Sequence, residues 1–438
     1  MPEPAVIVLV IDRLGAGMLG PYGNTWIDTP NFNRVASQSL VCENAIADSP
    51  SLEQAYRAYM LGEHALASTA GRELWQAWRT KVEPTQETLS VEPVASQLAH
   101  RPAFGALAAA AGVRTVLLTD NPAVADFETV RDFAEHIVLP LPAATTAAAD
   151  IAETSLANLF EAAADALRQM KPPFVLWIHA HGMAGPWDAP LNLRNQFADE
   201  DDPTPPTFVA PPEMHMPAGF DPDALLGFSH AYGGQVSLLD LCLGMLLDEI
   251  DQQPWAAQAS LTVTSPRGYP LGQHGRVGPC DDALFGELLH VPLSVRLPHG
   301  QSTLERRRHL VQPTHLHATL LELTGLQAST DQQTEPSLLA LLNDTWNSHG
   351  QVACSLGPGQ RLIRTPAWSM RQSLMGDELR HDLFCKPDDF WEVNEISSRG
   401  TAIVALLAAE LERRQAAFLT TGIAQAAPLA EPLTNLWR

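Results

Sequence analysis

The chain has 438 residues, of which 45% are hydrophobic, and this length favours one large domain together with a smaller one. Its formal net charge of −23 argues against nucleic acid and anionic membrane surfaces as partners, because both would repel the protein. The five cysteines are odd in number and show no C-x-x-C spacing, which argues against a disulfide framework and against a structural zinc site.

The beginning of the chain gives an expectation about location. The first apolar run starts within a few residues of Met1, has no basic segment before it and is too short to cross a bilayer. We therefore expect neither a signal peptide nor a membrane-spanning segment, and we expect a cytoplasmic protein that does not bind membranes.

Apolar runs alternate with amphipathic stretches over most of the chain. Four runs predict strands that are buried on both faces: Val6–Ile11, Thr115–Asp120, Phe174–Ala180 and Leu261–Ser265. The helical candidates are Ala103–Gly112, Ala148–Met170 and Phe228–Ile250. This order predicts an α/β fold with a mostly parallel central sheet sandwiched by helices. Polar residues follow several strands, and we expect them to meet at the carboxyl edge of the sheet: Asp12, Asp120, His179 and the segment Ser265–Gly268.

Two further segments complete the predicted organisation. The proline-rich stretch Asp201–Asp223 predicts a long surface loop without regular structure. Near the end of the chain, short strand-like runs over residues 360–373 and 378–396 precede a helical pattern at Thr401–Leu419. We therefore expect a large α/β domain over residues 1–346 and a small subdomain of antiparallel sheet plus helix over residues 347–438.

Motifs spread along most of the chain resemble those of one known family. They are VIVLVIDRLG, DTPNFNRVA, CENAIADSP, AGVRTVLLTD, FVLWIHAHGMAGPWDAP, LGQHGRVGPCDDALFGELLHVPLSVRLP, THLHATLLELTGL and the tail segments RTPAWSMR and HDLFCKPDDFWEVNE. In this order they resemble segments of the sulfatases, which belong to the alkaline phosphatase superfamily. The resemblance implies the α/β fold of that superfamily, and fold alone does not give activity.

The resemblance also implies a metal site, at which this chain departs from the family. Family members hold a divalent cation with two acids after the first strand and with a later [ST]-D-[HN]-G motif. Here these positions read Asp12-Arg13 and Ser265-Pro266-Arg267-Gly268. One carboxylate beside two guanidiniums is a poor site for a hard cation. We therefore expect no metal, with Asp12 as a residual ligand, and the alternative is Ca²⁺ or Mg²⁺ in a partly retained site.

The family's nucleophile is a Cys or Ser that is oxidised to formylglycine. Aligning Gly62 with the last glycine of that motif places Leu52 at the nucleophile and Tyr56 at the motif's arginine. Ser51 lies one residue earlier. We expect it to cap a helix, with a plain serine nucleophile as the alternative, although a serine needs a base or a metal to activate it.

Histidines and arginines remain at other family positions. His179 matches the first histidine of its motif, whereas the second falls at Ala184. His274 matches a glycine-flanked histidine, and Arg276 lies near a position where a lysine often binds substrate. The candidate ligand-binding residues are thus Asp12, Arg13, His179, Arg267, His274 and Arg276, and the weak catalytic candidates are Ser51, His179 and His274.

These substitutions have one effect in common: they place arginine guanidiniums where family members have metal-binding carboxylates and a cation. Arg13 could pair with Asp12, or Arg13 and Arg267 could bind a sulfate, phosphate or carboxylate group without metal. We expect a catalytically impaired sulfatase-family protein with an arginine- and histidine-lined anion pocket. One alternative is a diverged sulfuric or phosphoric ester hydrolase that uses Ser51 or water, and another is a structural or oligomerisation scaffold.

Overall fold

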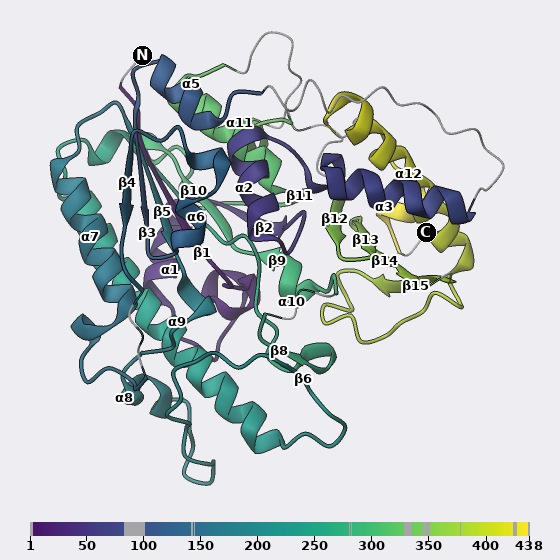
Figure 1. Cartoon of the computed structure of the whole chain (residues 1–438), viewed down its shortest axis with the longest axis horizontal. Coiled ribbons are helices and arrows are strands. Elements are labelled where there is room, and N and C mark those ends of the chain that lie inside the picture. The colour runs from purple at the N-terminus through teal and green to yellow at the C-terminus, as the bar shows by residue number, and fades with distance from the viewer. Residues whose placement is uncertain are drawn as a thin grey trace. The chain divides into compact units, whose positions relative to one another are not determined.

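The computed structural model describes most of the chain and forms two compact units, which are considered separately below (Figure 1). The described residues are 3–82, 101–141, 143, 145–279, 281, 283–327, 335–343, 346, 351–376, 378–423 and 427–436. The first unit comprises Met1–Glu43, Ala108–Cys280 and His290–Arg307. The second comprises Asn44–Leu107, Asp281–Leu289 and Arg308–Arg438.

A nine-stranded sheet organises the α/β part of the fold, and its strand order is β4-β3-β5-β1-β7-β10-β2-β11, with β9 paired to β2. The strands are β1 (Ala5–Ile11), β2 (Leu40–Ile46), β3 (Arg114–Thr119), β4 (Glu135–Val138), β5 (Phe174–Ala180), β7 (Ala259–Thr264), β9 (His290–Val291), β10 (Leu293–Arg296) and β11 (Glu305–Val311). From β4 to β7 neighbouring strands run parallel, and β10 is antiparallel to both β7 and β2. The predicted α/β fold with a mostly parallel central sheet is confirmed.

The register of the parallel strands fixes where their carboxyl ends meet. Val10 of β1 lies opposite His179 of β5 on one side and opposite Thr264 of β7 on the other. All seven residues of β1 are buried, as an apolar strand covered on both faces requires. The residues that directly follow β1, β5 and β7 are therefore held close together at one edge of the sheet.

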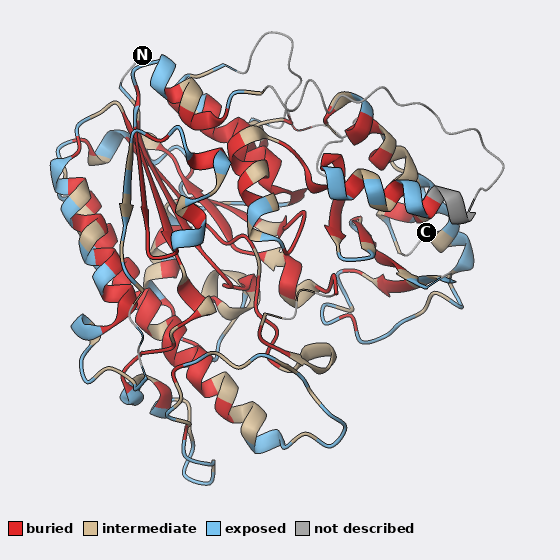
Figure 2. Ribbon diagram, in the orientation of Figure 1, coloured by how far each residue is buried: buried red, intermediate tan, exposed pale blue. Residues whose placement is uncertain are grey.

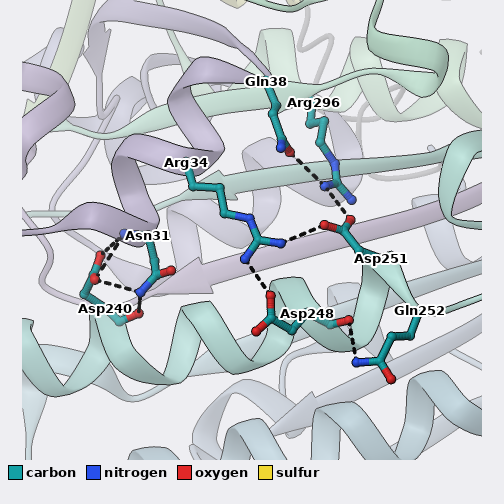
Figure 3. Close-up of polar contacts among 8 residues, drawn as sticks. All are labelled: Asn31, Arg34, Gln38, Asp240, Asp248, Asp251, Gln252 and Arg296. Atoms are coloured by element: carbon teal, nitrogen blue, oxygen red, sulfur yellow. Dashed lines mark hydrogen bonds and ion pairs between the residues drawn. The ribbon is translucent and has the colours of Figure 1, made fainter.

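Helices of the first unit cover the sheet and share its core. They are α1 (Pro30–Ser37), α6 (Pro122–Ala125), α7 (Ser155–Gln169), α8 (Leu191–Asn195) and α9 (Pro222–Asp251). Apolar side chains of α7 and α9 belong to the same buried cluster as Ile7, Leu9 and Ile178. Figure 2 shows most of the central strands coloured as buried. The Asp240 carboxylate of α9 accepts the backbone N–H groups of Asn31 and Phe32, which ties the first turn of α1 to α9 (Figure 3).

The second unit contains the antiparallel sheet expected near the end of the chain. Its strands follow one another in sequence and are β12 (Ala353–Gly357), β13 (Gln360–Arg364), β14 (Trp368–Met375) and β15 (Glu378–Cys385). Its helices are α2 (Leu52–Leu61), α3 (Thr69–Val82), α10 (Gly286–Leu289), α11 (Pro313–Thr324), α12 (Thr401–Thr421) and α13 (Glu431–Thr434), and α5 (Phe104–Ala110) crosses the boundary between the units. Leu407 and Leu411 of α12 share a core with Ile363 and Met370 of the sheet. The expected division between residues 346 and 347 stays a prediction, and this unit also draws on residues 44–107.

Two predicted elements differ from the structure at their ends. The helix expected from residue 148 begins at Ser155, where the Thr154 hydroxyl accepts the N–H of Ala157 at 3.2 Å. The loop expected over Asp201–Asp223 is wrong at two places: β6 (Met214–His215) pairs with β8 (Arg276–Val277), and α9 starts at Pro222. Proline suits the first helical position because its fixed φ is already helical and its missing N–H is not needed there.

A part of this proline-rich segment is held by a buried arginine rather than by regular structure. Arg194 is fully buried, and its Nη1 donates to the carbonyl oxygens of Pro206 at 2.7 Å and Phe208 at 2.8 Å. Its Nη2 donates to the carbonyl oxygen of Trp187. A single guanidinium thereby satisfies three backbone acceptors that have no strand or helix partner. No helix in the described part of the chain is long and apolar enough to span a membrane.

Asp48 in the second unit leads to a prediction about pH. Its Oδ2 accepts the N–H of Ala65 at 2.9 Å, whereas its Oδ1 is buried without a partner among the described residues. Burial, helped by the charge of Glu63, raises the pKa of Asp48 to about 7. The folded protein therefore keeps a proton that the unfolded chain releases near pH 4, so stability should fall as the pH rises from about 4 to about 7.

Asp48→Asn keeps an acceptor for Ala65 without the charge. Above pH 7 we expect it to raise the free energy of unfolding by up to about 4 kcal/mol, and with it the melting temperature. Near pH 4 both quantities should be unchanged. Thermal unfolding followed by circular dichroism between pH 4 and 8 would measure this, with the exposed Asp132→Asn as control. An unchanged pH slope in Asp48→Asn would contradict the prediction.

Candidate functional site

A buried ion pair joins the ends of two neighbouring strands of the first unit. Asp12 follows β1, and Arg267 lies in the segment that follows β7. Arg267 Nε donates to Asp12 Oδ1 at 2.8 Å, and Arg267 Nη2 donates to Asp12 Oδ2 at 2.8 Å. Asp12 is 1% exposed, and the Arg267 side chain is 14% exposed. The geometry is the bidentate arrangement in which guanidinium and carboxylate bind most strongly.

The ion pair sets the charge state of Asp12. Burial by itself would raise the pKa of this carboxyl group, but the charge and hydrogen bonds of Arg267, with a further contribution from Arg13, lower it to about 2. Asp12 is therefore ionised at every physiological pH. One of the two sequence hypotheses paired Asp12 with Arg13, and the structure shows Arg267 as a bidentate partner of Asp12.

Arg13 adopts a backbone conformation that is uncommon for its residue type. Its φ is 65°, in the left-handed region, and the residue is only 3% exposed. The Tyr232 hydroxyl of α9 donates to the Arg13 carbonyl oxygen at 2.9 Å, and the Leu14 N–H donates to Ser265 Oγ at 3.2 Å. Such a conformation costs energy and persists only where its surroundings enforce it, so it marks this turn as a functional candidate. No sequence signal pointed to Tyr232.

Two histidines and a carboxylate complete the site. His179, in β5, is fully buried, and burial lowers its pKa to about 4, although the charge of Asp12 acts in the opposite direction. Burial also lowers the pKa of His181. The backbone N–H of His181 donates to Asp120 Oδ1 at 2.7 Å, and burial raises the pKa of Asp120 to about 6. Around Asp12 the structure thus assembles two guanidiniums and two mainly neutral imidazoles.

The remaining two ligand-binding candidates lie in the segment after Arg267. His274 is part of a short 3-10 turn (Gln273–Gly275) and has a left-handed φ of 53°. Arg276 begins β8, and its Nη1 donates to the His274 carbonyl oxygen at 3.1 Å. The structure thus brings His274 and Arg276 together in one turn next to β6. Their place in the anion pocket stays a prediction.

The nucleophile region belongs to the second unit. Leu52 is the first residue of α2, and the expected cap is observed because Ser51 Oγ accepts the N–H of Gln54 at 3.4 Å. Tyr56, which aligns with the family's arginine, is fully buried in the core. Arg57 forms an ion pair with Glu63 at 2.5 Å. The hydroxyl of Ser51 therefore has a structural role at the helix terminus.

The residues at the carboxyl edge do not fit the divalent cation that the resemblance implies. Both oxygens of Asp12 bond to Arg267, and the second acidic position is an arginine. Across the described residues, no group of three or more His, Cys, Asp or Glu side chains is placed to hold a metal ion. A cation here would have to displace a guanidinium and tolerate another, which Coulomb repulsion opposes.

A double-mutant cycle tests the energetic importance of the ion pair. Asp12→Asn or Arg267→Met alone should lower the free energy of unfolding by about 3–5 kcal/mol, because each leaves a buried charge uncompensated. Asp12→Asn combined with Arg267→Met should cost much less than the sum of the two single changes. Urea unfolding would measure these values, and additive costs would contradict the interpretation.

The same pair should show a defined pH window. Because the pKa of Asp12 falls from its usual 3.8 to about 2, its stabilisation is present above pH 4 and is lost as the pH falls toward 2. The difference in free energy of unfolding between the wild type and Asp12→Asn should therefore become smaller as the pH falls from 4 toward 2.

Comparisons with known proteins agree with these features of the fold. A family model described as Sulfatase matches residues 4–326. Over 66 residues the chain is 30% identical to human arylsulfatase D and 36% identical to human steryl-sulfatase, which in each case is 15% of this chain and 11% of the relative. Over 171 residues it is 25% identical to a sulfatase of Formosa agariphila, covering 38% of this chain and 32% of the relative. The matched segments therefore span about a third or less of these relatives.

Solved structures show the same fold over nearly the whole chain. The phosphonate monoester hydrolase of Agrobacterium radiobacter superposes with a TM-score of 0.71 at 15% identity, covering 95% of this chain and 96% of that one. A 2-O GAG sulfatase superposes with a TM-score of 0.68 at 17% identity, covering 97% and 95%. At such identities the likeness establishes the fold alone. Because the family model matches well over half of its residues, this chain belongs to the sulfatase family.

Proposed function

We propose that this sulfatase-family protein has lost metal-dependent ester hydrolysis and binds a small anion at a pocket formed by Arg13, Arg267 and the neighbouring histidines. The observation that carries the proposal is the buried bidentate bond between Arg267 and Asp12. A guanidinium in this place supplies one positive charge with a fixed geometry. It cannot supply the open coordination position through which a metal ion polarises an ester or activates a nucleophile.

The charges around Asp12 favour an anionic ligand. Arg267 and Arg13 both lower the pKa of Asp12, so two guanidiniums lie near this one carboxylate within a buried environment. The lowered pKa values of His179 and His181 leave both rings mainly neutral near pH 7, so each can still donate one N–H group without adding charge. A sulfate, phosphate or carboxylate group is the ligand that this set recognises.

The alternative of a diverged hydrolase depends on Ser51 or on water. Ser51 Oγ already accepts a backbone N–H as the cap of α2, and the aligned nucleophile position is leucine. A serine needs a base or a metal to become nucleophilic, and no base among the described residues is bonded to Ser51 Oγ. We therefore favour ligand binding over turnover, and the scaffold alternative predicts neither.

Metal content and turnover provide the first test. We expect the purified wild type to contain no stoichiometric calcium or magnesium by elemental analysis and to hydrolyse no aryl sulfate. A triple variant with Arg13→Asp, Pro266→Asp and Arg267→Asn restores the family's oxygen ligands, and calcium should raise its melting temperature. Arg267→Asn alone is the matched control and should show no such shift. Hydrolysis of an aryl sulfate by the wild type that EDTA abolishes would refute the proposal.

Anion binding is tested separately with Arg13→Gly. Glycine suits the left-handed φ of 65°, so the change removes the guanidinium and relieves strain while it leaves the bond between Arg267 and Asp12 in place. Titration calorimetry with inorganic sulfate should show an affinity lower by about tenfold or more, since a charged hydrogen bond is lost. The exposed Arg168→Gln serves as a control for net charge. Equal affinity in Arg13→Gly and the wild type would rule out this pocket.

A further inference from the structure

A pocket lies at the end of the strands opposite the carboxyl edge of the same sheet. It has a volume of about 280 Å³ and is confined to the first unit. Ala259, the first residue of β7, and Arg296, the last residue of the antiparallel β10, both line it. Asp12 and Ser265 lie beyond the other ends of β1 and β7, about 20 Å away along a six-residue strand. This pocket is therefore separate from the proposed anion site.

Arg296 is the central polar residue of the pocket. It is 8% exposed, and its Nη1 donates to Gln38 Oε1 at 3.1 Å and to Asp251 Oδ1 at 3.2 Å (Figure 3). Its Nη2 is buried and has no acceptor among the described residues. A buried charged donor without an acceptor is costly, so such a group calls for a water molecule or a ligand.

Asp251, which also lines the pocket, bonds to a second arginine besides Arg296. Its other oxygen, Oδ2, accepts from Arg34 Nη2 at 2.8 Å, as Figure 3 shows. Arg34 Nη1 also bonds to Asp248 Oδ1 at 2.6 Å. One carboxylate is thus shared by two guanidiniums, and the Asp251 side chain is 42% exposed, where solvent weakens its effect. Arg34 and Arg296 are matched by two carboxylates, Asp248 and Asp251, so what Arg296 adds to the pocket wall is an Nη2 donor without an acceptor among the described residues.

The remaining walls differ on their two sides. Small apolar side chains form one side, with Ala256, Ala257 and Ala259 among the lining residues. His299 and Thr303 lie on the loop that follows β10, and His299 has a left-handed φ of 55°. A non-glycine residue in this conformation stores strain that the surrounding structure must enforce. The pocket thus combines a cationic group with an apolar surface, the combination that an organic anion needs.

We infer that this pocket binds a small organic anion, whose carboxylate, sulfate or phosphate group bonds to Arg296 and whose apolar part lies against the alanines. Because Nη2 is covered in the present conformation, the guanidinium must rotate before Nη2 can donate to the anion. The site goes beyond the proposed function and does not depend on it, because it shares no residue with the pocket around Asp12.

Saturation-transfer NMR with benzoate and phenyl sulfate as probes tests this inference. Both probes should bind the wild type at millimolar concentration, and Arg296→Gln should weaken binding at least tenfold. Ala257→Phe fills the pocket from an exposed position and should weaken binding equally, which keeps the test valid if Arg296→Gln fails to fold. Arg34→Gln is the matched control, because it also removes a guanidinium bonded to Asp251 but Arg34 does not line the pocket. This variant should retain binding.

The outcomes separate this site from the proposed function. Benzoate binding that persists in Arg13→Gly but disappears in Arg296→Gln supports the second site. Unchanged binding in Ala257→Phe would overturn it. A loss of binding in Arg34→Gln equal to that in Arg296→Gln would also overturn it, because the probes would then report only nonspecific electrostatic attraction to arginines. Loss of sulfate binding in Arg13→Gly bears on the first site alone.

Discussion

The bond between Asp12 and Arg267 is the interaction on which the candidate site depends. It joins the ends of β1 and β7, which are already neighbours in the sheet, and it places a carboxylate that is 1% exposed beside its guanidinium. Removing either partner alone would leave a charge without compensation in a low-dielectric environment. We therefore expect substitutions at these two positions, 255 residues apart in sequence, to be energetically coupled.

An internal guanidinium and a bound cation solve the same electrostatic problem differently. A divalent ion can leave, exchange ligands and act as a Lewis acid, whereas Arg267 is covalently part of the chain and has no vacant coordination position. The left-handed Arg13, held by Tyr232 and by the hydrogen bond from Leu14 to Ser265, keeps the geometry of a specialised turn. Under the proposed function, this site would still position an anion but would lack the metal-dependent means of attacking it.

The sequence was sufficient for the fold and for the edge at which the site lies, because buried parallel strands are long apolar runs with polar residues at their ends. β5 was predicted with its observed bounds, and the capping role of Ser51 followed from its place before an amphipathic run. The choice of Arg267 as partner could not be predicted, because it depends on the register between β1 and β7. The same holds for the pocket around Arg296, because Gln38, Asp251 and Arg296 come from three distant segments. No local pattern marks a site that only tertiary packing assembles.

Helix α9 contacts both sites, and this raises the question of whether they are coupled. Tyr232 bonds to Arg13 at one place on the helix, and Asp251 bonds to Arg296 at its last residue, about 28 Å away along the axis. Coupling over such a distance requires an element with two discrete arrangements that both ligands bias. α9 is instead fixed between them, because Asp240 holds the first turn of α1 and the helix contributes to the buried core along most of its length. A rigid helix with a single arrangement holds both sites in place but cannot pass a conformational change from one to the other. The two sites should therefore bind their ligands independently.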